Sequence, residues 1–156
     1  MNSITGILIR EKIQNTDKIN VLWTSSDNMV FEQAFKKLKH NTISFDHLYF
    51  GKDTPQVIVC NNKILYYEKC KNISIQFHVP VLLIDHSVKP KELSEEEVNL
   101  HKYELPSAYK IAMNEKIATS WGGNYHKILT KEDITDTDMW QRVLFQTSKM
   151  VFKYYE

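Results

Sequence analysis

Cysteine and glycine are scarce in this sequence, and their scarcity excludes several kinds of site. Only two cysteines, Cys60 and Cys70, occur in 156 residues. One pair makes no disulfide framework and its spacing fits no zinc pattern, so we expect two reduced thiols packed in the core. The four glycines form neither a G-x-G-x-x-G sequence nor a Walker A loop, so no cofactor is expected. The six histidines show no H-x-H or H-E-x-x-H spacing, so no metal site is expected.

Charge of one sign and long apolar runs are also lacking. Lys and Arg total 20 against 19 for Asp and Glu, and this net charge of +1 gives no electrostatic reason to expect a nucleic-acid partner. The longest apolar run, residues 79–84, is far too short to span a bilayer. The first residues, MNSITGILIREK, lack the pattern of a signal peptide. We therefore expect a cytoplasmic protein, in the host cytoplasm if the Lys-, Asn- and Ile-rich composition reflects a viral or phage genome.

Short apolar runs alternate with amphipathic stretches along the chain. Strands are predicted at residues 4–10, 19–23, 43–50, 57–60, 79–84, 109–113 and 125–129. Helices are predicted at residues 31–39, 66–77, from Ser94 onward, at 114–121 before two glycines, and from Thr135 to the C-terminal region. The three lysines that end the first of these helices suit the negative end of its dipole, and we interpret them as solvated surface rather than a nucleic-acid patch.

This alternation predicts the fold class. Strands that alternate with helices form right-handed βαβ units and a mainly parallel sheet covered by helices on both faces. We therefore expect one Rossmann-like α/β domain over residues 1–156, with a doubly wound sheet of five to six strands and a C-terminal helix.

Polar residues follow several of the predicted strands directly. In open parallel sheets, ligands bind beyond the carboxyl ends of the strands, near the point where the strand order reverses. The candidate ligand-binding residues at these positions are Thr24, Ser25, Asn61, Asn62, Ser87, Asn114 and Glu115. Turns and helix caps use the same residue types, and for Ser25 and Asn114 capping remains the alternative interpretation.

Asp85 and His86 form the candidate catalytic pair. A histidine at a strand end can act as a general base or donate a hydrogen bond to a phosphate. The alternative is a histidine that is hydrogen-bonded into a turn. Phosphotransfer of the receiver-domain kind is not expected. A receiver domain has an acidic pair after the first strand and an aspartate after the third, whereas this chain has the sequences TSS and NN at the corresponding positions.

Four segments resemble the N-terminal, acceptor-side half of GT-B glycosyltransferases. They are FEQAFKKLKHN, PQVIVCNN, FHVPVLLIDHS and KIAMNEKIATSWGG followed by HKIL, within residues 21 to about 129. The resemblance implies a transferase-like protein that binds a nucleotide-sugar or a glycan, with Asp85 and His86 on the acceptor side. The family's second half, with its Glu-containing motif, has no counterpart here, so activity is expected to need a partner chain or a homo-oligomer.

A non-catalytic interaction module on the same fold, such as a viral or phage accessory or structural protein, is the alternative function. Exposed aromatic residues would favour it. The candidates are Tyr66, Tyr67, Trp121 and the tail FKYY at 152–155. The residues leave open whether the chain is an enzyme.

Overall fold

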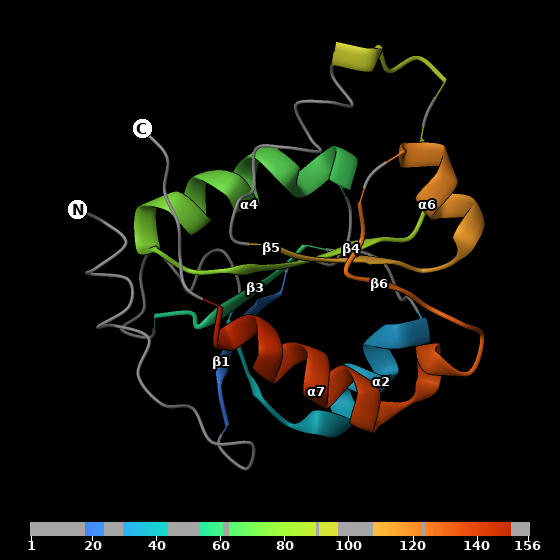
Figure 1. Ribbon diagram of the computed structural model, residues 1–156. Coiled ribbons are helices and arrows are strands. Elements are labelled where there is room, and N and C mark those ends of the chain that lie inside the picture. The colour runs from blue at the N-terminus through green and yellow to red at the C-terminus, as the bar shows by residue number, and fades with distance from the viewer. Residues whose placement is uncertain are drawn as a thin grey trace.

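The computed structural model describes residues 18–23, 30–43, 54–60, 63–89, 91–96, 108–122 and 124–150, which form one six-stranded parallel sheet with helices on both faces (Figure 1). The strands are β1 (Asn20–Trp23), β2 (Asn41–Ile43), β3 (Val57–Cys60), β4 (Val81–Asp85), β5 (Ala108–Ala112) and β6 (Lys127–Ile128). Their order is β2-β1-β3-β4-β5-β6, and all five pairings are parallel. The predicted α/β fold is confirmed, and the strand order reverses between β1 and β3.

Among the described residues, four helices cover the sheet. They are α2 (Val30–Leu38), α4 (Lys63–Phe77), α6 (Glu115–Trp121) and α7 (Thr137–Ser148). Figure 1 shows α4 and α6 on one face and α2 with the C-terminal α7 on the other. Among the described helices, none is long and apolar enough to cross a membrane.

The apolar central strands divide their side chains between the two faces. In β3, Val57 and Val59 belong to the core beneath α2 and α7, whereas Ile58 and Cys60 belong to the core beneath α4. Successive residues of a strand point to opposite faces, so a strand buried on both sides is apolar at every position. Cys60 and Cys70 are both fully buried, the second within α4, as predicted.

The ends of α6 and α7 are set by local polar contacts. Asn114 accepts a hydrogen bond from the Ile117 backbone N–H at 2.9 Å, and Gly122 ends α6 in the left-handed region at φ 61°. The prediction that Thr135 begins the last helix is wrong by two residues, since α7 begins at Thr137. Thr135 lies in a 3₁₀ turn, and the Asp136 carboxylate accepts from the N–H groups of Asp138 and Met139 instead.

The observed strands β1, β2, β4, β5 and β6 differ in their bounds from the predicted strands 19–23, 43–50, 79–84, 109–113 and 125–129. Strand β2 begins at Asn41, which pairs with Asn20, and only Ile43 of the predicted strand 43–50 belongs to it. The rest of that range, and the strand predicted at 4–10, lie outside the described residues. Strand β4 begins at Val81 rather than at Val79, because the Val79 N–H and C=O both bond to Ser74 at the end of α4.

Candidate functional site

The carboxyl ends of β4 and β5 bring two predicted polar segments side by side. Asp85 and Ala112 are paired in the sheet, and the Met113 N–H donates to the Asp85 carbonyl at 3.0 Å. Asp85, His86 and Ser87 therefore leave the sheet next to Asn114 and Glu115. We call these five residues the β4–β5 edge site. The other predicted ligand residues, Thr24, Ser25, Asn61 and Asn62, lie outside the described residues.

Asp85 forms the buried floor of the β4–β5 edge site. Its side chain is 2% exposed, and Oδ2 accepts a hydrogen bond from the Tyr125 hydroxyl at 2.5 Å. Burial and the negative charge of Asp85 raise the pKa of Tyr125 far above its usual value near 10, so the phenol is protonated and donates at neutral pH. Sequence reasoning missed Tyr125, because a tyrosine beside a short apolar run is also typical of a strand.

The loop after β4 is held against α6. The Trp121 Nε1–H donates to the Ser87 carbonyl at 2.8 Å, and the Lys89 N–H donates to the Ser120 hydroxyl at 2.6 Å. Trp121 is 3% exposed, so the prediction of an exposed aromatic there is wrong. The apolar part of the indole packs into the core, and its one N–H forms the hydrogen bond to the loop. His86 is half-buried and the Ser87 side chain is exposed, so both are accessible to solvent. They lie on the loop that the two hydrogen bonds hold against α6.

Asn114 and Glu115 lie at the other side of the β4–β5 edge site. The Asn114 amide oxygen caps α6, so capping is the role that the structure shows for this residue. Both side chains are exposed, and Glu115 is in the first turn of the helix. A ligand role for either remains a prediction, and it would use the Asn114 amide NH₂ and the Glu115 carboxylate.

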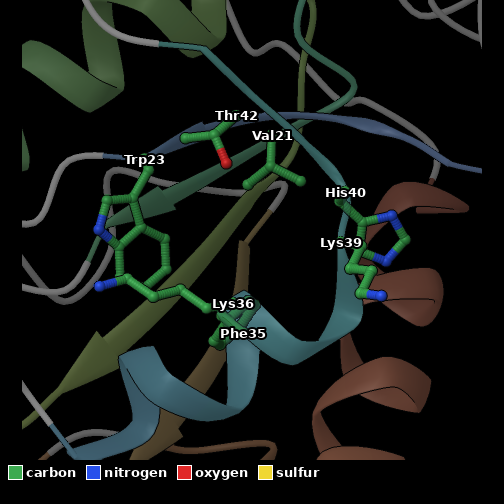
Figure 2. A pocket seen from close by; sticks show the side chains of 7 residues that line it. All are labelled: Val21, Trp23, Phe35, Lys36, Lys39, His40 and Thr42. Carbon is green, nitrogen blue, oxygen red and sulfur yellow. The ribbon is translucent and has the colours of Figure 1, made fainter.

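A cavity lies beside α2, and sequence reasoning missed it. It is a cavity of about 230 Å³ whose sheet side is formed by Val21 and Trp23 of β1 and Thr42 of β2. Its helix side is formed by Phe35, Lys36 and Lys39, with His40 at one end (Figure 2). We call it the α2 cavity. It depends on the packing of β1, α2 and β2 together, which no local pattern reveals.

No family model, curated protein or solved structure matches the chain. In the part of the chain that the structure describes, no three His, Cys, Asp or Glu side chains gather into a group that could hold a metal ion. The chemistry of the β4–β5 edge site and of the α2 cavity is therefore assigned from their own residues.

Proposed function

We propose that the chain is a glycosyltransferase-like module that binds a nucleotide-sugar, or a glycan, at the β4–β5 edge site. The observation that carries the proposal is the junction of Asp85–Ser87 with Asn114–Glu115 at the carboxyl ends of two adjacent parallel strands. Ligands of open α/β folds bind beyond the carboxyl ends of the strands, although the order of this sheet reverses between β1 and β3 rather than at β4 and β5. The partial resemblance to the acceptor-side half of GT-B enzymes supports the sugar-containing ligand.

Within this proposal, His86 is the general base and Asp85 is a positioning residue. Asp85 is buried and accepts from Tyr125, whereas His86 is half-buried at the solvent side of the same strand end. A neutral imidazole can take the proton of an acceptor hydroxyl, and an imidazolium can donate to a phosphate oxygen. Ser87, Asn114 and Glu115 supply hydroxyl, amide and carboxylate groups of the kinds that bind sugar hydroxyls.

Sugar transfer requires a second nucleotide-binding domain in GT-B enzymes. In this proposal that domain is contributed by a partner chain or by a second copy in a homo-oligomer. Ligand binding is consequently the first property to test, because it does not depend on the partner.

A thermal-shift screen against UDP-, GDP-, ADP- and CMP-sugars tests the proposal. A ligand at 100 times its Kd stabilises the folded state by about 2.7 kcal/mol. For a domain of this size, that corresponds to a rise in Tm of roughly 5–10 °C. We expect one nucleotide family to produce the rise and His86→Ala to abolish it.

His126→Ala is the matched control, because this histidine is exposed and precedes β6, away from the carboxyl ends of β4 and β5. It should keep the ligand-induced shift measured from its own Tm. A shift that survives in His86→Ala would place the ligand elsewhere. No shift with any compound would favour the interaction module. Trp121 would not contribute to the surface of such a module, because it is buried.

A further inference from the structure

The α2 cavity is a second ligand site that goes beyond the proposed function. We propose that it binds a small aromatic anion, with the ring against the wall formed by Trp23 and Phe35 and the acid group paired with Lys36 or Lys39. Strand order separates it from the β4–β5 edge site, because β1 and β2 lie on one side of β3 and β4 and β5 lie on the other. The two sites can therefore be tested independently.

The size and walls of the cavity suit an aromatic ring system. An apolar cavity of about 150 Å³ is large enough for benzene, and the α2 cavity measures about 230 Å³. The Trp23 and Phe35 rings lie 5.2 Å apart between centroids, and Phe35 in turn packs on Trp140 at 5.1 Å. Trp140 is fully buried, so the aromatic wall rests on the core and changes little when a ligand enters.

Two ammonium groups make the cavity selective for an anion. Figure 2 shows Lys36 extended along the Trp23 indole and the Lys39 side chain beside His40, so each end of the cavity carries one cation. Both side chains are exposed, and neither forms an ion pair with a carboxylate of the described residues. The described lining residues include no Asp or Glu. An acid group at either end gains a charge-assisted hydrogen bond without displacing a carboxylate of the described residues.

The imidazole of His40, near the cavity mouth, has a protein partner at each ring nitrogen. Its Nδ1 accepts from the Ile19 N–H at 3.2 Å, and its Nε2 lies 2.9 Å from Gln141 Oε1. Because both nitrogens have protein partners, the imidazole forms part of the wall, and the acid group is assigned to the two lysines.

Isothermal titration with 2-naphthoate and with its neutral analogue 2-naphthalenemethanol tests this site. Lys36→Gln combined with Lys39→Gln removes both cations, whereas Lys37→Gln removes an exposed cation of the same helical turn that does not line the cavity. An exposed ion pair is worth up to about 1 kcal/mol, or about fivefold in affinity. We expect the double variant to weaken naphthoate binding about fivefold, the alcohol to be affected less than about twofold, and Lys37→Gln to behave as the native protein.

Thr42→Phe gives an independent control on location. Thr42 is an exposed residue of the edge strand β2 that lines the cavity, so an aromatic side chain there fills part of the space while the strand tolerates it. Both probes should then bind at least about tenfold more weakly. Failure of both probes to bind the native protein, equal naphthoate affinity in the double variant and Lys37→Gln, or unchanged binding in Thr42→Phe would each overturn the proposal.

Discussion

Replacing Tyr125 with Phe removes the hydrogen bond that the Tyr125 hydroxyl donates to the buried Asp85 carboxylate. The variant keeps the ring and its packing and removes only the hydroxyl, which lies 2.5 Å from Asp85 Oδ2. A hydrogen bond to a charged group contributes about 1.5–3 kcal/mol, and the buried oxygen that loses it keeps its desolvation cost. Asp85 is 2% exposed, so we expect the variant to be less stable by about 2 kcal/mol at pH 8.

Because of the same bond, the difference in stability between the native protein and Tyr125→Phe depends on pH in the alkaline range. The pKa of Tyr125 is raised in the folded chain, chiefly by burial and then by Asp85, so its stabilising effect is fully present below pH 10 and is lost as the pH rises above it. In the unfolded chain the phenol ionises near its usual pKa of 10. Between pH 9 and pH 11 the advantage of the native protein over Tyr125→Phe should shrink by about 1.4 kcal/mol.

Urea unfolding followed by circular dichroism at pH 8, 9 and 11 measures both effects. Tyr109→Phe is the control at pH 8, because the Tyr109 ring stacks on His126 and its hydroxyl bonds to no carboxylate of the described residues. Its stability should change by less than about 0.5 kcal/mol. Equal stabilities of the native protein and Tyr125→Phe at pH 8, or a difference that stays constant to pH 11, would refute the reasoning.

Three further predictions concern the local structure around the site and the core. Asn114→Ala removes the cap of α6 and should lower the stability by about 1 kcal/mol, or roughly 2–4 °C in Tm by calorimetry, while Asn114→Ser should recover most of it. Gly122→Ala should cost about 1 kcal/mol in urea unfolding, because the position has φ 61° and an added Cβ meets no atom within 4 Å, so backbone strain is the only penalty; a neutral result would contradict the left-handed cap. Cys60 and Cys70 are fully buried, so a thiol reagent should label neither until the chain unfolds, and rapid labelling of the native protein would contradict the α4 core.

The fold class was readable from the sequence because its determinants are local. Residues 57–60 are apolar at every position, which is the signature of a strand covered on both faces, and β3 has those bounds. The end of α6 was equally readable, since two glycines follow Trp121 and Gly122 adopts the left-handed conformation. The order of the strands was not, because alternation predicts parallel pairing but leaves open which strands are neighbours.

Only the part of the candidate site that lies at the end of a single strand could be predicted from the sequence. Asp85, His86 and Ser87 are consecutive, and their place after the buried strand β4 follows from its apolar run. The contact of Asp85 with Tyr125 joins residues 40 positions apart and had no local signal. The burial of Trp121 was not predicted for the same reason. Its indole N–H bonds to the loop carbonyl of Ser87, 34 residues away.

The proposed function is tested most directly by mapping the ligand on the chain with ¹H–¹⁵N NMR. The nucleotide-sugar with the largest thermal shift would be titrated into labelled protein. The proposal predicts that the backbone amide signals of His86, Ser87 and Asn114 move with a single Kd, while those of Lys36 and Lys39 at the α2 cavity stay in place. Movement at the α2 cavity without movement at the β4–β5 edge site, or no movement with any nucleotide-sugar, would contradict it.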